Sequence, residues 1–143
     1  MRTSKNGIDF IKKYEGLRQT AYRCPAGVLT IGYGHTGMDV TTDKTITEAE
    51  AERLLISDLR TIENAVRTAT GHLNQNQFDA LVSFTYNVGA RNLNRSTLLK
   101  YVKENPDDIK IQDEFMKWTY TKGKKLNGLQ NRRKEEATLY FNP

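Results

Sequence analysis

Apolar residues recur at helical spacing along most of this 143-residue chain. Between residues 47 and 68 they form one continuous stripe, which predicts a long amphipathic helix. The stripe consists of Ala51, Leu54, Leu55, Ile62, Ala65 and Val66. The segment Thr47-Glu-Ala-Glu50 at its start is a capping box, in which a hydroxyl and a carboxylate satisfy the first backbone N–H groups of a helix.

Shorter helices are expected on both sides of this stripe. The first carries Ile8, Phe10 and Tyr14, and Gly16 is expected to stop it, so that Glu15 lies in its last turn or just past it. Beyond residue 70, capping residues and apolar spacing predict four more helices. They start at the capping box Asn74-Gln-Asn-Gln77 (ending at Gly89), at Ser96, at Pro106 (with Ile109, Ile111, Phe115 and Trp118 as the apolar face) and near Leu129.

Residues 20–35 have a different pattern, in which strand-forming side chains are interrupted by turn residues. The strand formers are Thr20, Tyr22, Val28, Thr30, Ile31 and Tyr33, with Pro25-Ala-Gly27 between them as the turn. Residues 36–45 lack helical periodicity and are expected to form a loop or one further short strand. Strands are therefore expected only near the N-terminus, and the predicted fold class is α+β, dominated by helices.

Length and composition limit the classes of protein that this chain can be. The length fits one domain, built as one lobe or two. No apolar run is long enough for a transmembrane helix, so no stable membrane insertion is expected. The basic N-terminal residues are not followed by an apolar signal core, which predicts synthesis in the cytoplasm without a signal peptide. The single cysteine, Cys24, excludes an internal disulfide and fits a reducing compartment.

The charge is concentrated near the C-terminus. The chain has 22 basic and 17 acidic residues, a net charge of +5. Residues 115–136 hold seven basic residues, at positions 117, 122, 124, 125 and 132–134, against two acidic ones. This basic window could attract an anionic polymer such as nucleic acid or a bacterial wall, or it could simply be a solvated helix face. The chain has no nucleic-acid-binding signature, and its two histidines and one cysteine have no metal-ligand spacing.

The stretch from Glu15 to Thr36 carries the clearest candidate chemistry. It opens with a carboxylate at the expected end of a helix and continues as a hairpin punctuated by proline and glycines. A carboxylate at such a junction can be covered on one side and open on the other, a setting in which it can donate a proton near neutral pH. Glu15 is therefore the candidate general acid.

The order of residues in this stretch resembles the catalytic signature of the phage-type lysozymes, or endolysins, a family of glycoside hydrolases. That signature has Glu, then Asp or sometimes Cys, then Thr; here Glu15, Cys24 and Thr30 are followed by Ile-Gly-Tyr-Gly-His-Thr36. The resemblance continues in residues 76–89 and 128–136, so it spans nearly the whole chain.

The resemblance implies a fold and an activity. The implied fold has a small sheet lobe at about residues 15–46, a connecting helix at 47–68, and a helical lobe made of residues 1–14 and 69–143. The implied enzyme is a muramidase that cuts the β-1,4 bond between N-acetylmuramic acid and N-acetylglucosamine in bacterial peptidoglycan and so lyses cells. It is expected to be a monomer without a cofactor, and to reach the wall with the help of a phage holin or after lysis.

The resemblance also assigns roles to particular residues. Glu15 is implied to be the acid, and Thr30 to hold a water on the opposite face of the sugar, which gives inversion. Arg132 matches the arginine that approaches the catalytic Glu across the cleft of the family. His35 is implied to be structural and bonded to an acidic partner. The residues that match the wall of the cleft are Tyr86, Asn87 and Gly89.

Three further positions are interpreted from their chemistry. Gly32 and Gly34 are expected to let a sugar approach the backbone closely. Trp118 could stack on a sugar, but its spacing favours a place in the core. Cys24 leaves three roles open, because an ordinary thiol is mostly neutral at pH 7: assisting group in place of Asp, covalent nucleophile, or small strand residue.

Two other functions remain open on the sequence alone. Cys24 and His35 could form the dyad of a cysteine-dependent peptidoglycan peptidase or amidase, although no third orienting residue is evident. The basic window could instead mark a non-catalytic wall-binding module, which would not need Glu15 and Thr30 at this spacing.

Overall fold

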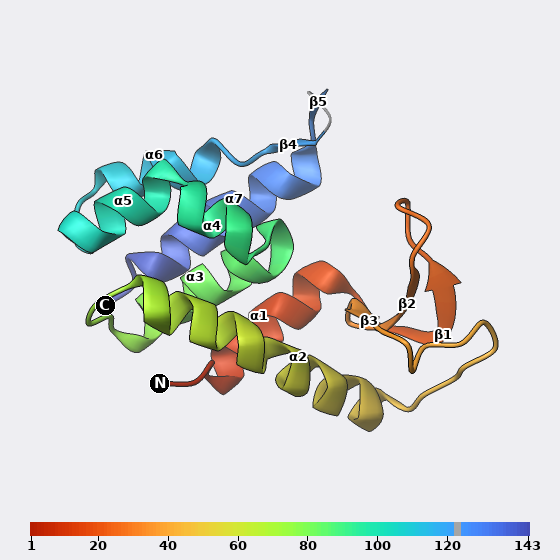
Figure 1. Cartoon of the computed structure of the whole chain (residues 1–143). Helices are drawn as coiled ribbons and strands as arrows, with labels where there is room; N and C mark the ends of the chain where they lie inside the picture. The colour runs from red at the N-terminus through yellow and green to blue at the C-terminus, as the bar shows by residue number, and fades with distance from the viewer. Residues whose placement is uncertain (122–123) are drawn as a thin grey trace. The chain divides into compact units, whose positions relative to one another are not determined.

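The computed structural model describes residues 1–121 and 124–143 (Figure 1). The described residues form seven helices and five short strands, so the predicted helix-dominated α+β class is confirmed. The chain divides into two compact units, one formed by Ile8–Arg60 and the other by Met1–Gly7 together with Thr61–Pro143. Helices α1 (Lys5–Glu15) and α2 (Glu48–Ala69) contribute residues to both units.

The unit Ile8–Arg60 contains a three-stranded antiparallel sheet in the order β1-β2-β3. The strands are β1 (Arg18–Arg23), β2 (Leu29–Gly32) and β3 (His35–Thr36). The turn between β1 and β2 begins at Cys24, whose carbonyl accepts the Gly27 N–H over 2.7 Å. Ile31 is completely buried, which anchors the central strand in the core of this unit. Ile11, Tyr33, Val40, Ile46, Ala51, Leu55 and Leu59 are buried as well.

Helix α2 forms where the apolar stripe predicted it. The capping box is present: the Glu50 N–H donates to Thr47 Oγ1 over 3.1 Å, and the Thr47 N–H donates to Glu50 Oε1 over 3.2 Å. Both bonds satisfy N–H groups that the first turn of a helix leaves without intrahelical partners. The stripe is buried at Ala51, Leu55 and Val66, and its other members, Leu54, Ile62 and Ala65, are half-buried.

The unit with Thr61–Pro143 is built mainly of helices. They are α3 (Gln75–Val88), α4 (Ala90–Arg95), α5 (Thr97–Glu104), α6 (Lys110–Met116) and α7 (Asn127–Tyr140). The predicted caps are confirmed, because Asn74 and Gln77 form a capping box and Ser96 caps α5. Helix α3 packs against α7. Aromatic side chains fill the core, with Phe84 edge-to-face against both Phe115 and Trp118 at 5.6 Å between ring centroids.

Four sequence-based expectations for this unit need correction. Strands also occur near the C-terminus, as β4 (Tyr120–Thr121) and β5 (Lys124–Lys125), which are too short to show an alternating pattern. Helix α4 was not expected, because its six residues are also too few for a periodic signal. Helix α6 begins at Lys110 and ends before Trp118, and Ile109 is 65% exposed. Helix α7 begins at Asn127, two residues earlier than expected.

Two further observations complete the description of the fold. Lys122 and Gly123, which the sequence places in a turn-rich loop, lie outside the described residues. In the parts of the chain that the structure describes, every helix is too short or too polar to cross a membrane.

Candidate active site

Glu15 is the last residue of α1 and its side chain is half-buried. The helix ends there because the Gly16 N–H makes the last helical bond, to the Lys12 carbonyl over 2.9 Å, and the chain then turns toward β1. The negative end of the helix dipole disfavours a carboxylate at this position. Helix stability therefore does not explain why a glutamate occupies the junction between α1 and the sheet.

Cys24 and Thr30 lie on the β1–β2 hairpin of the same unit. Cys24 is half-buried at the start of the turn, where its N–H donates to the Val28 carbonyl over 3.0 Å. Thr30 is only 4% exposed, and its Oγ1 donates to the same Val28 carbonyl over 2.9 Å. The hydroxyl proton is used in this bond, so the lone pairs of Thr30 Oγ1 remain to accept a hydrogen bond from a ligand or water.

The turn also changes the acidity of the Cys24 thiol. Backbone N–H groups, first that of Val28 and then that of Ala26, lower the pKa of Cys24 by stabilising its thiolate. The Thr30 hydroxyl lowers the pKa of Cys24 as well. Because this hydroxyl has one proton, it can donate to the thiolate only when it leaves the Val28 carbonyl. The ionisation of Cys24 and the orientation of the Thr30 hydroxyl are therefore coupled.

Gly32 and Gly34 follow Thr30 in a segment of backbone that has positive φ angles. Their φ angles are +67° and +95°, a backbone conformation that residues other than glycine rarely adopt. A Cβ at Gly32 would also lie 3.4 Å from the Cβ of Ala51. The backbone angles at both positions, and the lack of space at Gly32, explain structurally why glycine occurs here. The close approach of a sugar to this backbone stays a prediction.

His35 on β3 lies between two carboxylates. Its Nδ1 is 2.8 Å from Asp58 Oδ2 on α2, and its Nε2 is 3.0 Å from Asp39 Oδ2 in the loop after β3. Burial alone would lower the pKa of His35, but the hydrogen bonds that its ring donates to Asp58 and Asp39 outweigh this effect, so the net direction is upward. The ion pair with His35 lowers the pKa of Asp39. Burial is the main influence on Asp58 and raises its pKa.

The other predicted site residues belong to the unit with Thr61–Pro143. Tyr86 and Asn87 form the last turn of α3, and Gly89 ends that helix by donating its N–H to the Thr85 carbonyl over 2.8 Å. Arg132 is on α7 and is buried. The structure thus places Glu15, Cys24, Thr30, Gly32, Gly34 and His35 in one unit, and Tyr86, Asn87, Gly89 and Arg132 in the other.

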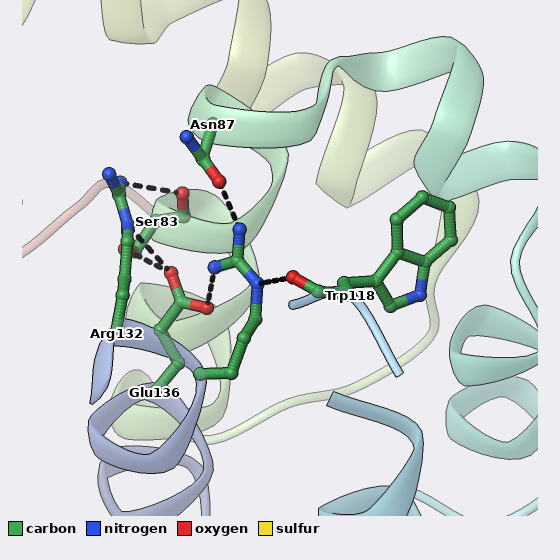
Figure 2. A network of polar contacts seen from close by, with 6 residues as sticks. Ser83, Asn87, Trp118, Arg132 and Glu136 are labelled. Atoms are coloured by element: carbon green, nitrogen blue, oxygen red, sulfur yellow. Dashed lines mark hydrogen bonds and ion pairs between the residues drawn. The ribbon is translucent and has the colours of Figure 1, made fainter. Parts of the chain in front are cut away.

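Arg132 is part of a buried polar network on α7 and α3 (Figure 2). Glu136 is completely buried and accepts from three groups: Ser83 Oγ over 2.6 Å, Arg132 Nε over 3.2 Å, and a guanidinium N–H of Arg133. Arg132 also donates to the Ser83 carbonyl over 3.1 Å. A buried charge is tolerated when it is paired and hydrogen-bonded, and Glu136 supplies that partner to both arginines.

Arg133 connects this network to Asn87 and Trp118. Its side chain is 0% exposed; its Nε donates to the Trp118 carbonyl over 3.0 Å, and its guanidinium donates to Asn87 Oδ1 (Figure 2). The guanidinium also lies over the Phe84 ring, 5.1 Å from its centroid. Trp118, expected in the core, is half-buried and makes an edge-to-face contact with Phe84.

Sequence reasoning missed several of these residues. Arg133 and Glu136 were counted only as charges of the basic window, although their spacing of three residues on a helix was a usable signal for a pair. Asp58 could not be matched to His35, because 23 positions separate them in the sequence. Within the described ranges, no group of three or more His, Cys, Asp or Glu side chains has the arrangement needed to hold a metal ion.

Comparisons with known proteins place these features in a family. A family model described as phage lysozyme matches residues 12–136. An endolysin of Bacillus phage B103 is 44% identical over 99% of this chain, and an endolysin of Acyrthosiphon pisum secondary endosymbiont phage 1 is 41% identical over 98% of both chains. The chain spans about half the length of the Bacillus phage endolysins that it matches, 54% and 55%.

A solved structure agrees with these sequence relatives. The muramidase domain of SpmX from Asticaccaulis excentricus superposes with a TM-score of 0.92 at 37% identity, and the match covers 99% of both chains. The family match extends from α1 through most of α7 and includes Cys24, Thr30 and Arg132. The chain therefore belongs to the phage lysozyme family.

Proposed function

We propose that the chain is a muramidase that hydrolyses the β-1,4 bond between N-acetylmuramic acid and N-acetylglucosamine in bacterial peptidoglycan. The observation that carries this proposal is the α1–hairpin unit, which holds Glu15 at a helix end and Cys24 with Thr30 on one hairpin. Membership of the phage lysozyme family supports it, as does the likeness to a protein described as a muramidase domain.

The proposed mechanism is a single displacement with inversion. Glu15 protonates the leaving oxygen while the bond from that oxygen to the anomeric carbon breaks. A water that donates to Thr30 Oγ1 attacks the carbon from the opposite face and forms the new bond. The thiolate of Cys24 takes the proton that this water loses. The lowered pKa of Cys24 supports this role, because more thiolate is present near neutral pH than for an ordinary cysteine.

The geometry weakens the alternative of a cysteine-dependent peptidase or amidase. A cysteine dyad needs a histidine nitrogen that accepts the thiol proton. Both ring nitrogens of His35 face carboxylates, those of Asp58 and Asp39. The neighbours that set the pKa of Cys24 are instead Val28, Ala26 and Thr30.

Other parts of the proposal rest on the sequence alone. They are that the protein is a monomer, that it uses no cofactor and binds no nucleic acid, and that it reaches the wall after release from the cytoplasm.

Digestion of purified peptidoglycan tests the proposal. A muramidase produces new reducing ends on muramic acid, a peptidase or amidase produces new amines, and a binding module produces neither. NMR of the first product is expected to show the α anomer, since the wall linkage is β and the displacement inverts. A β product would point to a covalent intermediate, with Cys24 as the nucleophile.

A substitution of Glu15 tests the role of the acid. Glu15→Gln keeps the shape of the side chain and removes its titrating proton, so the rate of release of reducing ends should fall about a hundredfold or more. Glu104→Gln is the matched control, because Glu104 is exposed at the end of α5 and loses the same charge. A folded Glu15→Gln enzyme with the parent rate would remove Glu15 from the mechanism.

A further inference from the structure

Strand β3 is very short and lies beside the strand that carries Thr30. Its two residues pair antiparallel with β2, Thr36 with Thr30 and His35 with Ile31. Strands in globular proteins usually have about five or six residues, so a ladder of two pairs provides few hydrogen bonds to fix β3. A contact outside the ladder is therefore needed to hold this strand in place.

The chain on both sides of β3 restrains the strand little. Gly34 comes directly before it and Gly37 directly after it. Glycine has more backbone freedom than any other residue, so these flanking positions leave β3 free to move unless a side chain anchors it. Of the two side chains of β3, that of Thr36 is exposed and that of His35 is half-buried.

The side chain of His35 attaches β3 to helix α2. Its Nδ1 is 2.8 Å from Asp58 Oδ2. An ionised carboxylate can only accept, so Nδ1 carries the proton and donates. This bond does not require a charged ring, because the neutral tautomer with a proton on Nδ1 makes it as well. The contact of Nε2 with Asp39 stays within the loop that follows β3 and does not reach α2.

This anchor bears on Thr30 through the sheet. Strand β2 lies between β1 and β3, and the backbone of Thr30 pairs with Tyr22 on one side and with Thr36 on the other. The bond from Thr30 Oγ1 to the Val28 carbonyl sets the orientation of the hydroxyl, but the place of the hydroxyl depends on the backbone. One of the two strands that fix that backbone is therefore itself held by His35.

We propose that His35 and Asp58 are positioning residues for Thr30. By fixing β3 to α2, they keep Thr30 Oγ1 where it accepts a hydrogen bond from the attacking water. The effect is on the rate and not only on stability, because a displacement of about 1 Å at a reacting group can cost about a hundredfold in rate. The proposal rests on the proposed function, since it takes Thr30 as the residue that holds this water.

A double-mutant cycle tests whether the pair acts through Thr30. We would measure kcat and KM on short soluble wall fragments, at a temperature at which circular dichroism shows every variant to be folded. Asp58→Ala and His35→Leu each remove the bond to α2 from one side, and each should lower kcat at least about tenfold with KM within about twofold of the parent. In the Thr30→Ala background the same changes should lower kcat by less than about twofold.

Two conservative variants separate the bond to α2 from the charge of the cluster. Asp58→Asn keeps an acceptor for the Nδ1 proton of His35 and should retain most of the parent kcat. Asp39→Asn removes a charge beside the same histidine, leaves the bond to α2 intact, and should change kcat little. A loss of kcat in Asp39→Asn as large as in Asp58→Ala would overturn the proposal. Equal losses with and without Thr30 would overturn it too, because they indicate a general structural effect.

Amide hydrogen exchange measures the positioning without any catalysis. In His35→Leu the protected amides of β2 and β3 should exchange at least about tenfold faster, while those of α3 in the other unit keep the parent rates. Unchanged exchange in β2 would overturn the proposal whatever the chain digests. Faster exchange with the parent kcat would show that the place of Thr30 does not limit the reaction and would overturn it as well. Faster exchange in a chain that digests no peptidoglycan would overturn the muramidase and leave the anchoring of β2 in place.

Discussion

The acidity of Cys24 depends on backbone groups rather than on a charged neighbour. The N–H groups of Val28 and Ala26 face the thiol because the turn between β1 and β2 begins at this residue. They would stabilise any anion at position 24, including the carboxylate that the family signature more often has there. The local backbone therefore explains how cysteine and aspartate can occupy the same place in one mechanism.

Two substitutions at Cys24 test this equivalence. Cys24→Asp should keep or raise the rate near pH 7, and its activity should persist to lower pH, because a carboxylate ionises at about 4 and a thiol well above that. Cys24→Ala should slow the reaction less than Glu15→Gln does, since the acid and the Thr30 water site remain. The measurement is the rate of release of reducing ends across pH, at equal concentrations of folded protein.

The shape of these pH profiles separates the mechanisms. If Cys24 were the nucleophile of a peptidase, Cys24→Ala would abolish activity and Cys24→Asp would not restore it. Identical acid limbs in the parent and in Cys24→Asp would show that the thiol does not titrate in the reaction. An inactive, folded Cys24→Asp beside an active Glu15→Gln would contradict a glycosidase altogether.

At the level of single residues, the sequence predicts local features such as helix ends and turns better than it predicts which side chains pair with one another. The end of α1 at Glu15 follows from the glycine after it, and the turn at Cys24 follows from Pro25. The burial of Arg133 and Glu136 could not be predicted from composition, where both are simply charged. It depends on Ser83 and Asn87 of α3, which become neighbours of α7 only in the folded chain.

His35 and its two acidic partners connect three elements within the unit Ile8–Arg60. The histidine is on β3, Asp39 is in the loop that follows, and Asp58 is on α2. The side chain of His35 is 12% exposed, against 28% for Asp58 and 50% for Asp39. The contact with Asp58 is therefore the less screened of the two and should contribute more to holding the sheet against the helix.

The stability of the protein should depend on pH through this cluster. The folded pKa of His35 is raised, so its contribution is fully present below the unfolded value of about 6.5 and is lost as pH rises through the folded value. The folded pKa of Asp39 is lowered, so its contribution is present above about 4 and is lost in stronger acid. The folded pKa of Asp58 is raised, so ionisation of this carboxylate costs more in the folded state than in the unfolded state. Once Asp58 is ionised, it therefore reduces the stabilisation that His35 and Asp39 provide. The cluster should therefore stabilise most near pH 5 to 6.

His35→Asn should lower the free energy of unfolding by about 1–3 kcal/mol near pH 5.5 and by less at pH 9. Thermal unfolding at both values measures the difference, with a shift in Tm of about 2–4 °C per kcal/mol. His72→Asn is the matched control, because His72 is the other histidine of the chain and is exposed. An equal loss at both pH values would mean that the imidazole acts through its shape and not through its charge.

At the level of elements, long periodic segments were predictable and short ones were not. Helices α2 and α3 have capping boxes and many apolar positions, so their starts and faces follow from the sequence. Helix α4 and strands β4 and β5 have two to six residues, and what forms them is pairing and packing with the rest of the unit. Helix α6 starts late because Pro106 and Asp107 form a turn before it.

At the level of the whole molecule, burial changes the meaning of the basic window. Two of its seven basic residues, Arg132 and Arg133, are buried with Glu136 and cannot act as a solvated charged face. Lys117 and Lys134 are exposed, and Lys117 is paired with Glu114 at 2.6 Å. The net charge of +5 belongs to the chain as a whole, so attraction to an anionic wall need not come from this window alone.

Salt dependence can show whether the attraction exists and where it comes from. Surface attraction weakens as salt shortens the Debye length to about 8 Å at physiological ionic strength. Lysis of whole cells should therefore decline with added salt more steeply than hydrolysis of short soluble wall fragments, which present no extended charged surface. Equal salt sensitivity on both substrates would mean that electrostatic attraction to the wall does not contribute to lysis.

A pair of double variants then locates the charge. Replacing Lys117 and Lys134 by Gln removes two exposed charges from the window, and replacing Lys100 and Lys103 by Gln removes two exposed charges from α5. If the window attracts the wall, the first pair should flatten the salt dependence of cell lysis and the second should change it little, with rates on soluble fragments unaltered in both. Equal flattening would assign the attraction to net charge, because association steered by the total field does not depend on which lysines supply it.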